Sequence, residues 1–578
     1  MRLKSPPIFI FSIILLVGLL ASTISHAQKK FSLPKIPQIH FGLPHFKNPF
    51  VKDSTNKSFN NKRWFNYQKE APYTKNENAI PIAVGYTDFD ENIRDLQLLG
   101  KLPSDNSLTI RPYILPKSVT YDSLLKAIDP SLKNNGHLVH KKHFDVQLLP
   151  FNYLQKYNSH HPYGWNDGPL SFSKGYQYLA SGGVYMHWRN IHLTLRPEYF
   201  HTANDKYEIY SWGAVTPSIN KLIWGQSNLR IDFGPLAVTS GANNLWRGPG
   251  IVNSLLMTNN AQGFQNIGIQ TIRPIKTPLG SFELSIFGAT LTQNASQGFE
   301  NKFLRTASIN KNSRYINMLT LTYSPIFFKN FYLGANRVFH QFTRTTPSTN
   351  FMRDYVPVTL PLFRNVYQDN AEAIDQLISG FVKYTFPKEH AELYFEYGWN
   401  DGKSNSRDLI LDNSHSSASV LGFRKLQYIG NKNTFLSIGF EATRMAQMPS
   451  YLQRNAGNWY EHGLLTEGYT NENQILGAGS GFGNNIQSFS FSYNKNYLKY
   501  GIKLQRIANN PIGWVNLFDP NGGAPVWDDF TYGIVLKNQI KNILFNTNID
   551  WVHSNNYGWK EGIKRENFYI FLNAIYLW

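Results

Sequence analysis

The chain has 578 residues, of which 16% are charged, 42% are hydrophobic and 15% are aromatic. The low charge and abundant apolar residues argue against a disordered chain. The absence of cysteine excludes a disulfide scaffold, thiolate metal sites and a cysteine nucleophile. The formal net charge of +19 suits an anionic partner such as nucleic acid, lipid or an acidic polymer.

The N-terminus has the pattern of a secretory signal peptide. Arg2 and Lys4 give a basic start, and an apolar run follows at residues 8–21. Residues 25–27 (Ser-His-Ala) place small side chains at the two positions that a signal peptidase reads. We expect cleavage after Ala27, with a retained membrane anchor as the alternative. Export leaves no role for a nucleic-acid partner, despite the basic charge.

The chain after residue 27 is dominated by alternation with a period of two. No stretch there reaches the roughly 18 apolar residues that a membrane helix needs. Leu393, Phe395 and Tyr397 instead alternate with Glu392 and Glu396, as in a strand with one apolar face. The same alternation recurs at residues 191–199, 282–291, 314–324, 434–443, 488–494, 498–505 and 545–551.

The connections between these segments differ in length in a regular way. Some are short, such as residues 189–190 and 495–496, while others are long and polar, such as 345–373 and 448–485. Short turns on one side and long loops on the other are typical of outer-membrane barrels. The predicted fold class is therefore all-β: a transmembrane antiparallel β-barrel of roughly 16–18 strands. A large soluble β-sandwich or propeller is the alternative.

The last segment, residues 567–578, also alternates and ends on an aromatic residue. Phe568, Ile570 and Trp578 fall on one face. A terminal aromatic residue on such a strand resembles the assembly signal of outer-membrane barrels, so we expect the barrel assembly machinery as a partner. The opposite face, with Tyr569 and Ile575, is less polar than a water-filled lumen would require.

The segment before the barrel has a different composition. Residues 28–61 are rich in Pro, Lys and Phe without a period, which indicates an extended arm. Residues 119–132 predict a short helix that ends before Pro130. We therefore divide the chain into a signal peptide (1–27), an N-terminal periplasmic, partly helical region (28–165) and an outer-membrane barrel (166–578).

Two sets of titratable residues are candidate sites. His137, His140 and His143 are spaced by three and would share one broad side of a helix, where a metal could bind. We interpret them as solvated basic surface and predict no metal and no cofactor. The carboxylates Glu392, Glu396 and Glu441, with Lys499 and Lys503, are expected to line the lumen. Charge pairing accounts for these five residues without catalysis, and we predict no catalytic residue.

Two irregular segments interrupt the strand pattern, at residues 241–261 and 459–479. They combine indole, guanidinium, amide and carboxylate groups, which suit sugars because hydroxyls need donors and acceptors while a sugar face stacks on an aromatic ring. The alternative is structural, since a folded-in loop needs polar groups to satisfy its backbone. The candidate polysaccharide-binding residues are Trp246, Arg247, Asn259, Asn260, Trp459, Glu461 and His462.

Several stretches, in order along the chain, resemble the Wzi family of capsule assembly proteins. They are residues 155–168 (QKYNSHHPYGWNDG), 195–198 (LRPE), 246–250 (WRGPG), 254–261 (SLLMTNNA) and 459–479. The resemblance covers most of the chain from about residue 145 onward. It implies a barrel of about eighteen strands, closed on the periplasmic side by an N-terminal helical element. It also implies a lectin-like role in holding capsular polysaccharide at the cell surface.

The expected function is that of a non-enzymatic, lectin-like barrel of the outer membrane that binds and organises capsular or extracellular polysaccharide. The expected partners are this polysaccharide, outer-membrane lipids and lipopolysaccharide, whose phosphates would suit the basic charge. Two alternatives remain open. One is a channel or transporter for a small solute, and the other is an outer-membrane hydrolase that uses the lumen carboxylates.

Overall fold

The structure is a computed structural model. It describes residues 80–578, except for residues 86–88, 104–105, 116–118, 142, 209–217, 293–312, 344–349, 360–373, 401–411, 449–455, 464, 466 and 512–524. The expected signal peptide (1–27) and extended arm (28–61) therefore lie outside the described residues. No helix in these described ranges is long and apolar enough to cross a membrane.

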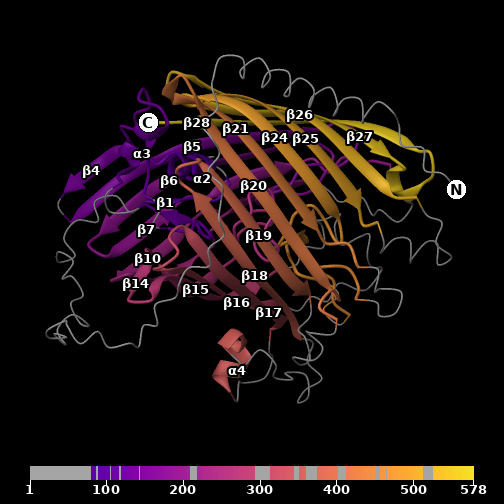
Figure 1. The fold of residues 1–578 in the computed structure, drawn as a ribbon, viewed down its shortest axis with the longest axis horizontal. Coiled ribbons are helices and arrows are strands. Elements are labelled where there is room, and N and C mark those ends of the chain that lie inside the picture. Colours follow the sequence, from indigo (N-terminus) through magenta and orange to yellow (C-terminus); the bar gives the residue numbers. More distant parts are fainter. Residues whose placement is uncertain are drawn as a thin grey trace, which may run out of the picture. The chain divides into compact units, whose positions relative to one another are not determined.

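Antiparallel strands make up most of the described chain (Figure 1). The first part of the wall contains β5 (Phe144–Asn158), β6 (Gly175–Trp188), β7 (Ile191–Leu195), β8 (Glu198–Thr202), β9 (Ile219–Ile223), β10 (Asn228–Phe233), β11 (Leu236–Gly241), β13 (Asn266–Thr271), β14 (Ile275–Thr277), β15 (Gly280–Leu291), β16 (Arg314–Pro325) and β17 (Phe331–Phe342). The second part contains β18 (Ile374–Phe386), β19 (Ala391–Asn400), β20 (Ser417–Ile429), β21 (Asn431–Arg444), β24 (Asn485–Lys495), β25 (Leu498–Asn509), β26 (Trp527–Ile540), β27 (Ile543–Asn555) and β28 (Lys564–Tyr576).

The sheet closes on itself. β28 pairs with β5, where Ile570 lies opposite Tyr157, and β7 pairs with β10, where His192 lies opposite Arg230. β7 and β8 share one position in the wall because Pro197 interrupts the strand between them. With β9–β10 and β13–β14 also counted as interrupted strands, the described residues form a closed barrel of 18 strands. This confirms the predicted fold class and strand number.

The barrel begins earlier in the chain than the predicted boundary at residue 166. β5 starts at Phe144 and is the strand against which the last strand closes, so it belongs to the wall. Its alternation is hidden in the sequence because the pairing with β6 shifts between Leu149 and Asn152, around Pro150. The shift reverses which parity faces inward, so no single period of two runs through the segment.

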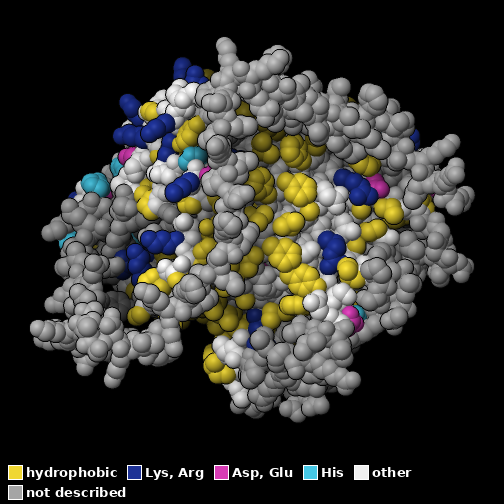
Figure 2. All heavy atoms as spheres, in the orientation of Figure 1, with side chains coloured by type: hydrophobic (Ala, Val, Ile, Leu, Met, Phe, Trp, Pro, Cys, Tyr) yellow, Lys and Arg dark blue, Asp and Glu magenta, His cyan; other side chains and the backbone are white. Residues whose placement is uncertain are grey.

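Opposite faces of the wall have opposite chemistry, as the alternation predicts. Leu393 and Phe395 are 44% and 39% exposed, while Glu392 and Glu396 of the same strand are fully buried inside. Figure 2 shows hydrophobic side chains gathered over the outer face of the strands in that view. An apolar outer band on a closed barrel is the surface that lipid requires. The fold is thus a transmembrane antiparallel β-barrel.

The two ends of the barrel differ. At one end, neighbouring strands are joined by short turns, such as residues 189–190, 430 and 496–497. At the other end lie the long connections, including residues 159–174, 242–265 and 445–484. We call these the short-turn end and the long-loop end. In outer-membrane barrels the short turns face the periplasm and the long loops face outward.

A small N-terminal element packs inside the barrel at the short-turn end. It contains α2 (Phe89–Leu98), α3 (Tyr121–Ile128) and the short strands β1 (Pro81–Ile82), β2 (Ile110–Arg111) and β3 (Tyr113–Ile114). The predicted helix at residues 119–132 is confirmed by α3, whose Thr120 caps the first turn by accepting from Ser123 N. α2 was not predicted, because its segment carries charged residues on the face that meets the barrel wall.

The N-terminal element explains the apolar inner face of the last strand. Phe89, Ile93 and Leu96 of α2 form one hydrophobic cluster with Ile575 and Leu577. A strand that faces a water-filled lumen needs polar residues on its inner face. Here that face is buried against helices, so apolar residues are favoured.

The remaining short elements lie in connections. They are β4 (His137–Lys141), β12 (Trp246–Arg247), α4 (Phe351–Tyr355), η2 (Pro357–Thr359), β22 (Thr470–Asn471), β23 (Gln474–Ile475) and η5 (Tyr557–Trp559).

Candidate functional site

The two irregular segments of the sequence fold into the barrel and pack against each other. Residues 242–265 and 456–484 form what we call the inner loop pair. Thr258 N donates to Leu476 O at 2.8 Å. The hydroxyl groups of Tyr460 and Tyr469 donate to Leu255 O and Leu256 O at 2.7 and 2.8 Å. Buried phenols thus satisfy carbonyls of a loop that has no strand partner there.

Carboxylates of the barrel wall hold the first of these loops. Glu441 accepts hydrogen bonds from three successive backbone N–H groups, those of Ile251, Val252 and Asn253, at 2.7, 3.1 and 2.7 Å. Glu396 accepts from Leu255 N at 3.2 Å. These lumen carboxylates are therefore engaged in positioning a loop.

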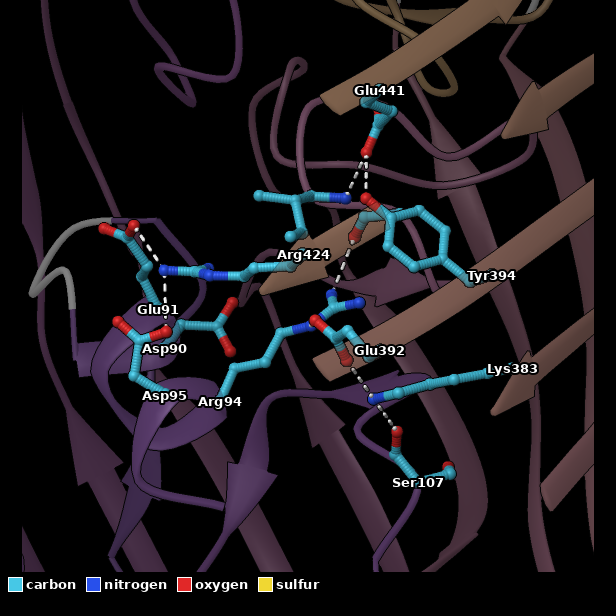
Figure 3. A network of polar contacts seen from close by, with 12 residues as sticks. Asp90, Glu91, Arg94, Asp95, Ser107, Lys383, Glu392, Tyr394, Arg424 and Glu441 are labelled. Atoms are coloured by element: carbon cyan, nitrogen blue, oxygen red, sulfur yellow. Dashed lines mark hydrogen bonds and ion pairs between the residues drawn. The ribbon is translucent and has the colours of Figure 1, made fainter. Parts of the chain in front are cut away.

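A network of ion pairs ties α2 to the wall from the other side (Figure 3). Glu91 lies 2.7 Å from Lys499 Nζ, 2.8 Å from Lys537 Nζ and 3.0 Å from Arg424 Nη2. Arg424 also reaches Asp95 at 2.7 Å. The expected charge pairing in the lumen is confirmed for Lys499, whose partner comes from an N-terminal helix that the sequence did not reveal. It is wrong for Glu396 and Glu441, which bind loop backbone instead.

A second part of the same network lies one turn along α2. Arg94 Nε donates to Glu392 Oε1 at 2.5 Å, and Lys383 Nζ lies 3.2 Å from the other oxygen of that carboxylate. Figure 3 shows Arg94 and Lys383 approaching Glu392 from different elements. Lys503, the other lysine expected in the lumen, pairs instead with Asp550.

The network sets the protonation of the helix carboxylates. Burial of Glu91 opposes its ionisation, but Lys499, Lys537 and Arg424 outweigh burial and hold its pKa well below the ordinary value. Asp95 behaves differently. Burial raises its pKa to about 6, and the opposing effect of Arg424 does not offset this. The pKa values of two carboxylates on one helix are therefore shifted in opposite directions.

A polar cavity of about 430 Å³ lies between the N-terminal element and the inner loop pair. Its lining combines aromatic rings with charged groups and includes Asp90, Arg111, Tyr163, Trp165, Asp167 and Trp246. Lys156 Nζ donates to Asp167 at 2.8 Å, and Tyr163 OH donates to Gln505 at 2.7 Å. Aromatic faces beside charged and amide groups are chemically suited to a sugar.

Trp246 and Arg247 lie deep in the barrel. They form β12, which pairs with β2 of the N-terminal element, and the guanidinium of Arg111 lies 4.4 Å from the centre of the Trp246 ring. Arg247 donates to Trp246 O at 3.0 Å and to Ser285 Oγ at 3.1 Å. Burial, and then the nearby Arg111, lowers the pKa of Arg247 to about 9. Both side chains are buried, and Trp246 also lines the polar cavity.

Asn259 and Asn260 are buried and satisfy backbone groups. Asn259 Nδ2 donates to Asn166 O at 2.9 Å, and Asn260 Nδ2 donates to Ile475 O at 3.0 Å. Asn259 also lines the polar cavity together with Trp246. These amides join the inner loop pair to the connection at residues 159–174.

The other three candidates lie at the long-loop end. Trp459 is buried and donates its indole N–H to Ser416 O at 2.9 Å. Glu461 and His462 are half-buried. Asn458 Nδ2 donates to Glu461 at 3.1 Å, and Leu465 N donates to His462 Nδ1 at 3.1 Å. Glu461 and His462 are the two candidates whose side chains reach solvent.

The seven predicted residues thus occupy three places rather than one site: the β12 strand, the asparagine pair and the Trp459–His462 turn. The structure does bring their two segments together, as one packed unit. Sequence reasoning missed Tyr163, Trp165 and Asp167 as cavity residues. The available signal was the density of aromatic, amide and carboxylate groups in residues 163–168.

Fold and site together define a class of protein: a transmembrane β-barrel whose lumen is occupied by an N-terminal element and by folded-in loops. The sequence matches the family described as capsule assembly protein Wzi over residues 157–500, which is more than half of the chain. The chain belongs to the Wzi capsule assembly family. No curated protein sequence matches it.

Similar solved structures have low sequence identity to this chain. Wzi of Escherichia coli, described as an outer membrane protein involved in group 1 capsule assembly and a carbohydrate-binding β-barrel, has a TM-score of 0.57 and 12% identity. The match covers 86% of this chain and 99% of that one. OccK5 (OpdH) of Pseudomonas aeruginosa has a TM-score of 0.40 and 9% identity, and the match covers 75% of this chain and 97% of that one. OccAB3 of Acinetobacter baumannii has a TM-score of 0.39 and 11% identity, and the match covers 75% of this chain and 98% of that one.

Proposed function

We propose that this protein is a lectin-like barrel of the outer membrane that binds and organises capsular or extracellular polysaccharide at the cell surface. Membership of the Wzi capsule assembly family supports this role. So does the fold shared with Escherichia coli Wzi, which is described as a carbohydrate-binding barrel. The role proposed is binding and not catalysis, because the lumen carboxylates Glu392, Glu396 and Glu441 are committed to cations and loop backbone.

The observation that carries the proposal is the occupied lumen. The N-terminal element fills the short-turn end, and the inner loop pair is held within the barrel by Glu441 and Glu396. A long polymer cannot thread a lumen filled in this way, so the surface offered to it is the long-loop end. Held at that surface, polysaccharide would stay attached to the cell without passing through the protein.

Within the long-loop end, the proposed contact is the turn at residues 458–462. Glu461 can accept from sugar hydroxyls, and His462 can donate or accept, because both are half-buried and not enclosed. Trp459 holds the turn in place through its hydrogen bond to Ser416 O. The buried candidates Trp246, Arg247, Asn259 and Asn260 act in this proposal by positioning the loops.

Location and further partners are part of the proposal. A removed signal peptide (residues 1–27) would export the chain, and the apolar outer wall would then place it in the outer membrane. The N-terminal element would face the periplasm, since it packs at the short-turn end. Outer-membrane lipids and the phosphates of lipopolysaccharide would surround the basic barrel, and the terminal strand would engage the barrel assembly machinery.

Deletion of the gene tests the proposal. Cell-attached polysaccharide should fall, shed polysaccharide should rise, and the total should stay unchanged, because synthesis does not depend on the barrel. Plasmid-borne wild-type protein should restore attachment. An unchanged attached fraction in the deletion strain would refute the role.

The polar cavity favours a second candidate, a channel for a small solute. Its lining of charged and aromatic groups lies inside the lumen. Planar-bilayer recordings distinguish the two functions, since a channel gives steady ion conductance while an occupied barrel gives little.

A further inference from the structure

The chain enters the barrel wall through a β-hairpin that carries two histidines beside a buried aspartate. β4 pairs with the start of β5, with His140 opposite Asp145 and His137 opposite Gln147. The hairpin extends the wall at the short-turn end, next to the turn between β6 and β7. Nothing in the proposed polysaccharide role uses these side chains.

An irregularity in β4 puts both histidines on the same side. In a regular strand, residues three apart point to opposite faces. The register of β4 shifts between His137 and Val139, where one residue is left out of the pairing. Because of this extra residue, the side chains of His137 and His140 point to the same side of the strand, and both face Asp145. The spacing of three noted in the sequence is thus accommodated on a strand, where His137 and His140 are exposed and share Asp145.

The distances are those of a metal site. His137 Nδ1 and His140 Nδ1 lie 3.3 and 2.9 Å from Asp145 Oδ1. One ligand atom from each of the three residues can be chosen so that all lie within 4.8 Å of one another. Two ligands of a tetrahedral zinc ion bound at about 2.0–2.1 Å are separated by about 3.3 Å. Only small side-chain shifts would therefore bring the three atoms around one ion.

A second observation concerns the buried acceptors at the same position. Asp145 is 0% exposed, and its Oδ2 has no hydrogen-bond partner among the described residues. Gln147, on the same face of β5, is also fully buried, and neither atom of its amide has a described partner. Burying such atoms unpaired is costly, and a carboxylate more so than an amide. A bound cation would compensate both the charge of Asp145 and its unpaired oxygen.

We propose that His137, His140 and Asp145 bind a divalent transition metal of the zinc class. Two imidazoles and a carboxylate are ligands that zinc accepts, with the fourth position left to water or to Gln147. The site would act as a clasp. Between α3 and β4 the chain crosses the seam of the barrel, where Asn135 N donates to Trp578 O at 2.6 Å. Metal at the hairpin would hold the N-terminal element to the strand that closes the wall.

Zinc titration of the purified, chelator-treated full-length protein in detergent tests the site. Wild-type protein should bind about one equivalent of Zn²⁺ tightly. His140→Gln and His137→Gln should each weaken binding by roughly tenfold or more. Co²⁺ in place of Zn²⁺ should give the intense visible absorption of a tetrahedral site in the wild type, but not in His140→Gln or His137→Gln.

His143→Gln is the matched control, because His143 belongs to the same hairpin but not to the cluster. It should bind zinc as the wild type does. Zn²⁺ should also raise the melting temperature of the wild type and of this control, but not that of His140→Gln. His140 is exposed, so this variant should insert normally and keep the test valid if His137→Gln does not fold. Equal zinc affinity in wild type and His140→Gln, or no tight binding by the wild type, would overturn the proposal.

Discussion

Lys499 of β25 donates to Glu91 of α2 at 2.7 Å, across a separation of 408 residues in the chain. With Lys537 and Arg424 on the same carboxylate, this contact joins the N-terminal element to three strands of the wall. The helix is therefore held by charge at its polar face and by hydrophobic packing at the other.

Glu91→Gln should loosen the N-terminal element. The substitution removes the negative charge that faces Lys499, Lys537 and Arg424 inside the barrel, and removal of one partner of a buried ion pair is strongly destabilising. Because the Glu91 side chain is 28% exposed, we expect a loss of about 1–3 kcal/mol, below the range for a fully buried pair. Amide hydrogen exchange of residues 89–98 in detergent-solubilised protein measures it. Glu389→Gln is the control, since that side chain is 73% exposed and should change stability by less than about 0.5 kcal/mol.

The same helix should respond to acid with a defined sign. The pKa of Glu91 is lowered in the folded state. Its contribution to stability is therefore complete above pH 4.5, the ordinary pKa of the group, and is lost as the pH falls below that value. The pKa of Asp95 is raised to about 6 in the folded state, so Asp95 lowers the stability of the fold as the pH rises from 3.8 to 6. The protection factors of the α2 amides, which correct exchange for its intrinsic rate at each pH, should therefore fall below pH 4.5 in the wild type, and less so in Glu91→Gln. Identical pH profiles of the two proteins would contradict the assignment.

Phe395 and Glu396 test the register of β19. Phe395→Arg places a charge on the lipid face near the middle of the strand and should cost about 2–4 kcal/mol. Glu396→Gln keeps one acceptor oxygen for Leu255 N and places an amide N–H beside the Ser379 hydroxyl, which can accept from it, so the expected cost is about 1 kcal/mol. Denaturant unfolding of refolded barrels in lipid gives both values. A larger cost for Glu396→Gln would mean that the faces are exchanged.

Removal of residues 576–578 should prevent assembly. Leu577 is buried against the N-terminal element, and Trp578 donates its indole N–H to Leu149 O at 2.7 Å on the strand that closes the barrel. We expect degraded or periplasmic protein with no heat-modifiable band on gels. Trp578→Phe keeps a terminal aromatic residue and should still insert. Normal insertion of the truncated chain would show that the end of β28 is dispensable.

Mutations should distinguish residues that contact polysaccharide from residues that brace the loops. Glu461→Gln and His462→Ala should release polysaccharide into the medium while the melting temperature stays unchanged, because both side chains reach solvent. Arg247→Ala should instead lower stability, by about 1–3 kcal/mol, since it leaves buried acceptors unpaired. Retention assays beside thermal unfolding measure both effects. Wild-type retention by folded Glu461→Gln and His462→Ala would remove this turn from the site.

Sequence alone could predict the wall of the barrel. Lipid on one side and protein on the other impose a period of two that is visible residue by residue, as at Leu393 and Glu392. The long and short connections followed from the spacing of the alternating segments, and the helix at residues 119–132 was predicted to end before Pro130. The beginning of β5 could not be predicted, because Pro150 and the register shift beside it hide the alternation.

What lies inside the barrel was decided by the tertiary structure. Glu91, Glu441 and Arg247 carry no local signal of their partners, since the contacts form between segments hundreds of residues apart. The meeting of His137 and His140 at Asp145 depends on one residue left out of a strand pairing, which no spacing rule reveals. Sequence determines which residues face inward, because that is a local property of the strand. Which inward residues meet depends on closure of the barrel, because closure brings distant strands and the N-terminal element into one enclosed space.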